Sequence, residues 1–269
     1  MKGFIRCATD GYRYGWHELN GGNLSYRLKD EEVAEVKGHF NFEHDWVEIG
    51  ATVLELGSEF FLVTGSGKFF SNVERNPEDN LAIIKIDEQG EKYRIVWGLR
   101  EGGCPTSELP SHLMNHEVKK LATNGAHRVI YHAHPTNVIA LTFVLPLKDE
   151  VFTRELWEVM TECPVVFPEG IGVVPWMVPG SKEIAVATSN LMKKYNIVVW
   201  AHHGLFCSGE DFDRAFGLID TVEKSADILV KVLSMGGKCQ RITVQNFRDL
   251  AKTFNVTIDE KFLYEKACK

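Results

Sequence analysis

The order of strands and helices along the chain predicts an α/β sandwich, in which helices cover both faces of a mixed β-sheet. Short apolar strands and helices alternate through most of the sequence. Residues 81–98 read as two strands around a glycine-containing turn, so part of the sheet is expected to be antiparallel. The 269 residues are 44% hydrophobic, which is enough for one large core, and no linker rich in proline or serine divides them. We therefore expect a single domain over residues 1–269.

The elements of the first half follow from apolar patterns and from helix start and stop signals. Residues 3–18 are predicted to be helical and to end before the Asn-Gly-Gly-Asn turn at 20–23, and residues 60–65 form a short buried strand. Residues 108–125 predict a helix, because Pro110 falls in its first turn and Gly125 marks its end.

The second half continues the alternation. Strands are expected at residues 128–134 and 197–204, a short extended segment at 170–176, and helices at 149–162, 181–196, 211–237 and 245–254. The helix 211–237 is the longest. Its apolar residues follow the spacing of one buried stripe, formed by Ala215, Leu218, Ile219, Val222, Ala226, Leu229, Val230 and Leu233.

The composition argues against several classes of protein. The formal net charge is −7 and no basic run reaches five residues, so no nucleic-acid surface is expected. No apolar stretch approaches the roughly 20 residues that a membrane-spanning helix needs. The first twenty residues lack the apolar core of a signal peptide, which favours a cytoplasmic protein. The six cysteines are widely spaced, without a CxxC pair, and are interpreted as free thiols.

Histidines at the ends of two predicted strands indicate a metal site. His132 and His134 lie two residues apart, so on a strand their side chains share a face. The second strand ends in His202 and His203, of which only one can face a given side. Three imidazoles with an open fourth position are typical of a catalytic zinc. The residues alone leave open which of the two neighbours takes part, and whether the HxH pair is only the solvent-exposed end of a strand.

Two other groups could compete for a metal. His112 and His116 lie four residues apart on a predicted helix, but they lack the HExxH arrangement and are interpreted as surface groups or as partners of the site residues. Cys207 lies near the end of the second strand and could serve as a soft ligand, but it is interpreted as a buried free thiol.

Three loops rich in small residues suggest a small phosphate pocket. The segment Thr-Gly-Ser-Gly-Lys at 64–68 follows a buried strand, and its backbone N–H groups can approach an anion, to which Lys68 adds charge. It lacks the spacing of a P-loop. The turns at 20–23 and 105–107 offer similar donors.

Two acids stand at helix ends. Glu108 precedes a helix, where it can complement the helix dipole or act as a general base or metal ligand. Glu162 ends the predicted helix 149–162, where the negative helix end disfavours an acid, so it is a candidate functional group.

Several stretches together resemble the rhamnulose-1-phosphate aldolases, a family within the class II aldolase/adducin superfamily. They cover most of the chain in the order of the family: NGGNLS, VTGSGKFFSNV, PTSELPSH, YHAHPTNVIALT, FTRELWEVMTECPVVFPEGIGVVPWMVPG, HHGLFCSG and GLIDTVEKSADILVKVLSMGG. The resemblance implies one class II aldolase domain, built as a three-layer sandwich around a mainly antiparallel sheet.

The resemblance also implies roles for individual residues. One Zn²⁺ per subunit would be held by His132, His134 and the histidine directly before Gly204, which is His203. His202 departs from the residue usual in the family and is expected to face away. Glu108 would be the catalytic base and a fourth zinc ligand in the absence of substrate. Glu162 would assist proton transfer from a neighbouring subunit of a homotetramer. The phosphate would lie against Asn20, Asn23, Ser66, Gly67, Thr106 and Ser107.

The reaction implied is reversible cleavage of L-rhamnulose 1-phosphate to dihydroxyacetone phosphate and L-lactaldehyde in rhamnose catabolism, through a metal-stabilised enediolate. Three alternatives remain open at this point: a fuculose-1-phosphate aldolase, a sugar-phosphate 4-epimerase and a non-catalytic interaction module like that of adducin. A Schiff-base aldolase with Lys68 as the nucleophile is a further mechanistic alternative.

Overall fold

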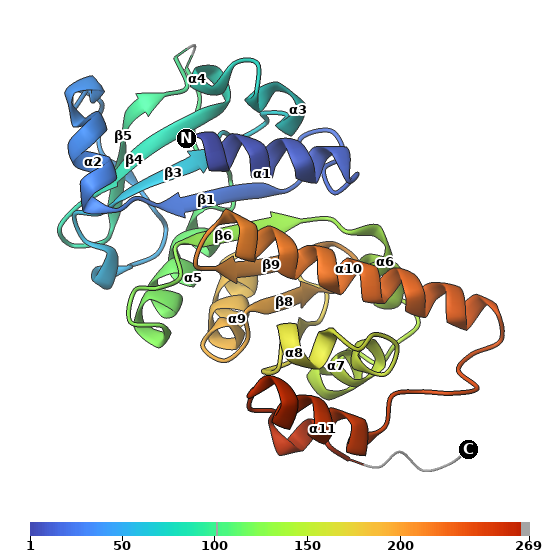
Figure 1. Ribbon diagram of the computed structural model, residues 1–269. Helices are drawn as coiled ribbons and strands as arrows, with labels where there is room; N and C mark the ends of the chain where they lie inside the picture. The colour runs from blue at the N-terminus through green and yellow to red at the C-terminus, as the bar shows by residue number, and fades with distance from the viewer. Residues whose placement is uncertain (101, 265–269) are drawn as a thin grey trace.

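A nine-stranded sheet forms the centre of the computed structural model, which describes residues 1–100 and 102–264 (Figure 1). The strand order is β2-β5-β4-β3-β1-β6-β9-β8-β7, and every neighbouring pair is antiparallel except β7 and β8. The strands are β1 (Asn23–Arg27), β2 (Val47–Glu48), β3 (Phe60–Thr64), β4 (Leu81–Ile86), β5 (Lys92–Gly98), β6 (Val129–Ala133), β7 (Gly172–Val174), β8 (Ile197–Trp200) and β9 (Gly204–Gly209). The prediction of a mixed, mainly antiparallel sheet is confirmed.

Helices cover both faces of this sheet, as the alternation of strand side chains requires. On β6, Val129 and Tyr131 belong to the core that includes Phe4 of α1 (Lys2–Arg13) and Leu218 of α10 (Phe212–Ser234). Ile130, between them, packs in a different core on the side of α9 (Lys182–Met192). Figure 1 shows α1 and α10 along one side of the sheet, with α5 (Leu109–Ala122) and α9 on the other. The predicted sandwich is therefore confirmed.

The remaining helices are short or lie at the ends of the sheet. They are α2 (Asp30–Val36), α3 (Phe70–Val73), α4 (Pro77–Asn80), α6 (Thr136–Leu141), α7 (Asp149–Trp157), α8 (Cys163–Val166) and α11 (Val244–Phe254), with 3-10 turns at Lys37–His39, Leu54–Leu56 and Glu260–Phe262. None of the helices in the described ranges is long and apolar enough to cross a membrane.

Every long predicted helix except that at 245–254 extends past its observed end, and the excess is largest, at five residues, for two of them. The helix expected at 3–18 ends at Arg13, because Gly15 adopts a φ of +77° that stops the helix. The helix expected at 149–162 ends at Trp157, and a separate short helix, α8, begins at Cys163 with Pro164 in its first turn. Glu162 is therefore not at the C-terminal end of a helix. It lies at the N-cap position of α8, where an acid carries no dipole penalty, so the argument from its position was wrong.

The strand expected at 197–204 is in fact a hairpin. β8 ends at Trp200, the chain turns at 201–203, and β9 begins at Gly204 and pairs antiparallel with β8. His202 lies in this turn with a φ of +63°, not on a strand. Strand alternation therefore cannot explain why His202 would face away from the other histidines.

Candidate functional site

Three histidines meet at the edge of the sheet where β6 ends. The candidate ligand atoms of His132, His134 and His203 all lie within 4.8 Å of one another. His132 is on β6, His134 follows the strand and donates its backbone N–H to the Trp16 carbonyl, and His203 lies in the turn between β8 and β9. The structure thus brings together the three residues that the sequence and the family resemblance predicted.

The hydrogen bonds of two of these rings leave their Nε2 lone pairs facing each other. His132 Nδ1 lies 2.9 Å from the Leu205 carbonyl oxygen, which only accepts, so the proton is on Nδ1. His134 Nδ1 likewise donates to the Glu18 carboxylate at 2.7 Å. The two Nε2 atoms are 3.2 Å apart. A tetrahedral metal with metal–nitrogen distances of about 2.0–2.1 Å would hold two nitrogens about 3.3 Å apart, so the arrangement fits a shared cation.

His203 completes the set with an unsatisfied ring. Its Nδ1 is buried and has no hydrogen-bond partner in the described part of the chain. Burial, with a smaller contribution from His134, lowers the pKa of His203 to about 4, so the imidazole is neutral at physiological pH. Burial also holds the pKa of His132 well below its usual value, with the neighbouring rings of His134 and His203 adding to the shift. Neutral imidazoles are the form that binds a metal ion.

Gly204 explains how the turn comes so close to β6. A Cβ atom at this position would lie 2.4 Å from the Ala133 carbonyl oxygen and 2.8 Å from Cδ2 of His134. His202, in contrast, points away from the cluster: its Nδ1 lies 3.0 Å from the Thr142 hydroxyl and its ring packs on Phe143.

Glu108 lies beside this cluster as a buried acid. It occupies the N-cap position of α5, and its Oε2 is 3.6 Å from Nε2 of His132. Asn23, the first residue of β1, donates its side-chain N–H to the same oxygen at 2.8 Å. Burial raises the pKa of Glu108, and the Asn23 hydrogen bond opposes that rise. A desolvated carboxylate whose pKa is raised is suited to remove a proton.

The predicted anion loops line the same cavity, which has a volume of about 170 Å³. Its walls are Asn20, Gly21, Gly22, Asn23, Gly65, Ser66, Gly67, Thr106, Ser107, Glu108, His132, His134, Pro179 and His203. Gly67 has a φ of +68°, which favours glycine in this loop. The cavity therefore joins the three histidines and Glu108 to all six residues that the family resemblance assigned to phosphate.

Three other candidates lie outside the cavity. The lining within the described ranges does not include Glu162, which is exposed at the start of α8, or Lys68. Cys207 is fully buried on β9, and its thiol lies 3.4 Å from the Ala215 carbonyl oxygen. It is a core residue and not a metal ligand.

Two features of the site were missed or only half predicted. Glu18 carries no pattern in the sequence, because its contact with His134 joins residues that are 116 positions apart. His112 and His116 were interpreted as surface groups or as partners of the site. They are buried, which excludes the surface alternative, and His112 contacts Asn23.

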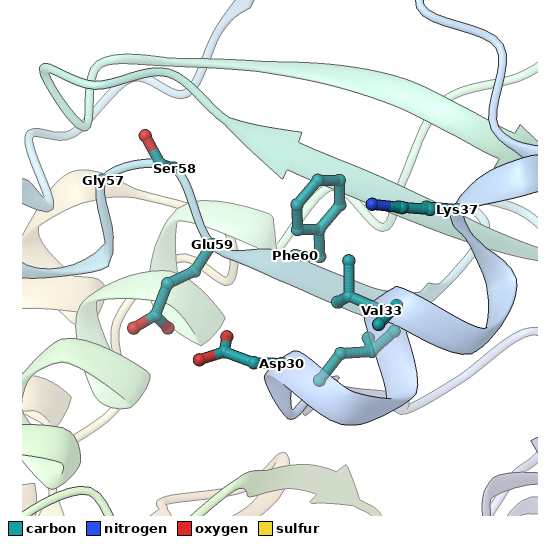
Figure 2. Close-up of a pocket in the computed structure, with 9 residues that line it drawn as sticks. Asp30, Val33, Lys37, Gly57, Ser58, Glu59 and Phe60 are labelled. Carbon is teal, nitrogen blue, oxygen red and sulfur yellow. The ribbon is translucent and has the colours of Figure 1, made fainter.

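A larger cavity of about 400 Å³ lies between α2 and β3 (Figure 2), and no histidine or cysteine is among its described lining residues. Figure 2 shows the carboxylates of Asp30 and Glu59 on one side and Phe60 with Val33 on the other. Glu59 already pairs with Arg27 at 3.3 Å and with Lys120 at 2.7 Å. The histidine cavity is therefore the candidate active site.

Comparison with known proteins agrees with this geometry. Residues 2–230 match the family model of the class II aldolase and adducin N-terminal domain, so the chain belongs to this family. It is 54% identical to the rhamnulose-1-phosphate aldolase of Mannheimia succiniciproducens and 50% identical to that of Pectobacterium atrosepticum, in each case over 96% of this chain and 94% of the relative.

Solved structures show the same fold. A sugar-phosphate aldolase from Thermotoga maritima superposes with a TM-score of 0.74 at 28% identity, covering 87% of this chain and 95% of the other. An L-fuculose-1-phosphate aldolase from Thermus thermophilus has a TM-score of 0.58 at 21% identity, covering 88% of this chain and 96% of the other.

Proposed function

We propose that this protein is a lyase that reversibly cleaves L-rhamnulose 1-phosphate to dihydroxyacetone phosphate and L-lactaldehyde, as a zinc-dependent aldolase of rhamnose catabolism. One observation carries the proposal: three clustered imidazoles, a buried carboxylate and three loops of small polar residues share one cavity. The relatives named rhamnulose-1-phosphate aldolase support the choice of substrate.

His132, His134 and His203 would hold one Zn²⁺ per subunit. The facing Nε2 atoms of His132 and His134, and the unpartnered Nδ1 of His203, support a cation at this position. An all-imidazole set leaves the metal its full positive charge. When bound, the metal would supply Lewis-acid stabilisation of the negative charge that develops on the ketose during carbon–carbon cleavage.

Glu108 acts as the base in this proposal. In the condensation direction it removes a proton from C3 of dihydroxyacetone phosphate, and in cleavage it returns one. Both contacts of its carboxylate involve Oε2, from Asn23 and from His132. In this proposal the other oxygen, Oε1, faces the substrate.

The phosphate would bind against Asn20, Asn23, Ser66, Gly67, Thr106 and Ser107. The cavity lining that the structure describes contains no lysine or arginine, so uncharged donors must hold the anion. Thr106 and Ser107 directly precede the 14-residue helix α5, whose positive N-terminal end favours a phosphate. Of the two side-chain N–H groups of Asn23, one donates to Glu108 and the other remains for the ligand. Anchoring the non-reacting end orients the reacting carbons.

We further propose that residues 1–269 form one class II aldolase domain that assembles as a homotetramer. Glu162 is exposed and lies outside its own protomer's cavity, so a catalytic role requires a neighbouring subunit. In that arrangement Glu162 would assist proton transfer at the aldehyde end. No nucleic acid or membrane partner is part of this proposal.

Two related functions are the alternatives. A fuculose-1-phosphate aldolase would use the same residues on a substrate of different stereochemistry, and a 4-epimerase would recombine the two fragments after cleavage. A Schiff-base mechanism through Lys68 is disfavoured, because Lys68 does not line the cavity among the described residues. A non-catalytic module would have no need for the buried acid beside the histidine cluster.

The decisive experiment is a cleavage assay of L-rhamnulose 1-phosphate and L-fuculose 1-phosphate, with and without a metal chelator. We expect dihydroxyacetone phosphate and L-lactaldehyde from the rhamnulose ester, faster than from the fuculose ester. The activity should disappear with chelator and return with Zn²⁺. Cleavage that survives complete removal of metal, or borohydride trapping of substrate on the protein, would contradict the metal mechanism.

A further inference from the structure

A chain of hydrogen bonds runs from Glu108 into the interior behind the cavity. Asn23 donates to Oε2 of Glu108 at 2.8 Å, and the other end of the Asn23 amide, Oδ1, contacts Nε2 of His112. The Ser25 hydroxyl then lies 2.6 Å from Nδ1 of His112 and 2.8 Å from Nε2 of His116. Asn23 and Ser25 come from β1, and the two histidines come from α5.

The chemistry of these groups gives every hydrogen bond one direction. An ionised Glu108 only accepts, so Asn23 must present its N–H₂ group to it and its carbonyl to His112. Nε2 of His112 must then carry a hydrogen, and in a neutral ring Nδ1 accepts from the Ser25 hydroxyl. The Ser25 oxygen in turn accepts from Nε2–H of His116. All four donors therefore point toward the carboxylate.

Burial and packing hold this chain in place. His112, Ser25 and His116 are at most 1% exposed, so bulk water does not compete for their hydrogen bonds. His112 packs edge-on against Phe206, with ring centroids 5.3 Å apart, and His116 packs against Phe61 at 5.0 Å. Burial lowers the pKa of His112 to about 3, which keeps the ring in the neutral form that the chain requires.

We propose that His112 is a positioning residue for the reaction, which acts through Asn23 on the Glu108 base. Its Nε2–H binds the Asn23 carbonyl oxygen and so selects one of the two orientations of the amide. This inference rests on the proposed function, because it assigns His112 a part in the Glu108 step. Ser25 and His116 hold His112 in the tautomer with hydrogen on Nε2.

The selection matters because Glu108 holds only the N–H₂ end of the Asn23 amide, and the donor from His112 fixes the carbonyl end in the same orientation. In the opposite orientation the Asn23 oxygen would face the Glu108 carboxylate, and two acceptors would repel. The carboxylate would then lose the donor that holds Oε2 and would be free to leave its position beside His132. A small error in the position of a base lowers the rate strongly.

Two substitutions of His112 separate its two nitrogens. In His112→Gln the side-chain N–H₂ reaches the position of Nε2, so the donor to Asn23 is kept while the acceptor for Ser25 is lost. In His112→Asn the amide ends near the position of Nδ1, so the contact with Ser25 is kept while the donor to Asn23 is lost. Both replacement side chains are uncharged and no larger than histidine, so the two variants form a matched pair.

The measurements are kcat and KM for cleavage, the zinc content, and the incorporation of deuterium at C3 of dihydroxyacetone phosphate in D₂O, which isolates the proton-removal step. We expect His112→Asn to lower kcat and the exchange rate by about 10- to 100-fold, the range typical of residues that orient a site group, with KM and zinc content nearly unchanged. His112→Gln should retain most of both rates.

The outcomes separate this inference from the proposed function. If the wild-type protein neither cleaves the sugar phosphate nor exchanges the C3 proton, the proposed function fails. If the wild type is active and His112→Asn matches it, or if both variants lose activity equally, the role of His112 is refuted. Should His112→Asn not fold, His112→Leu takes its place, because leucine has no donor for Asn23: exchange below about one tenth of the wild-type rate, with His112→Gln retaining most of it, supports the inference, and wild-type exchange in His112→Leu contradicts it.

Discussion

The contact between Glu18 and His134 predicts that an exposed acid controls the affinity of the metal site. Glu18 Oε1 lies 2.7 Å from Nδ1 of His134, and the Glu18 side chain is 69% exposed while that of His134 is 9% exposed. The carboxylate fixes the proton on Nδ1 and directs Nε2 toward Nε2 of His132, 3.2 Å away. Glu18→Ala removes this restraint and leaves the ligand itself intact.

The expected magnitudes differ sharply between folding and metal binding. An exposed pair contributes little to folding, so the free energy of unfolding of the metal-free protein should change by less than about 1 kcal/mol. Partners that orient a metal-bound imidazole typically account for 10- to 100-fold in metal affinity, so the zinc affinity should fall by about 1.4–2.8 kcal/mol. Competition with a chromophoric chelator measures the affinity, and urea unfolding measures the stability.

Two matched variants test the reasoning. Glu18→Gln keeps an oxygen acceptor at the same reach, so it should lose less affinity than Glu18→Ala. Glu43→Ala removes another exposed acid outside the cavity and should leave the affinity unchanged. Wild-type zinc affinity in Glu18→Ala would refute the orienting role. An equal loss in Glu43→Ala would show that only the net charge matters.

Three further predictions concern the base, the backbone and the buried histidines. Glu108→Gln should leave a folded, zinc-binding protein whose kcat falls by about 100- to 10,000-fold, and full activity in the cleavage assay would exclude Glu108 as the base. Gly217, inside α10, has no atom within 4 Å of a built Cβ, so Gly217→Ala should raise the free energy of unfolding by about 0.5–1 kcal/mol in urea. Gly98 has a φ of +87°, and a Cβ atom there would lie 2.0 Å from the Leu81 carbonyl oxygen, so Gly98→Ala should lower the free energy of unfolding. Equal changes in the free energy of unfolding for the two glycine variants would contradict this reasoning. Burial lowers the pKa values of His17 and His112 to about 3, so as the pH falls below about 6.5 the unfolded chain takes up their protons first. Stability should therefore drop by roughly 1.4 kcal/mol per pH unit for each ring until about pH 3, and equal urea midpoints at about pH 7 and about pH 5.5 would refute this.

Local patterns predicted the main elements and part of the site. The spacing of His132 and His134 places both on one face of a strand, and this holds in the structure up to the strand end at Ala133. The histidine cluster contains His203 and not His202, as the family resemblance implied. Strand alternation could not have made this choice, because the chain turns at these residues and His202 has a φ of +63°.

The rest of the site depends on pairings between distant strands, which local patterns do not contain. β1 was not predicted, since its five residues mix polar and apolar side chains that are all buried. Yet β1 lies between β3 and β6, and it pairs Asn23 with His132 across the sheet. That register is the reason that Asn23, which the sequence predicted to lie in a turn, becomes the partner of Glu108.

The antiparallel order of the central strands explains why so many loops converge at one edge. When neighbouring strands alternate in direction, the start of one lies beside the end of the next. The start of β1 therefore lies beside the ends of β3 and β6, and the start of β9 lies beside the ends of β6 and β8. The predicted anion loops and the histidines occupy these positions, so the candidate active site is a consequence of strand order. A change that shifts the register of β1 by one residue would turn Asn23 to the opposite face and separate Glu108 from its partner, although no residue of the site had been replaced.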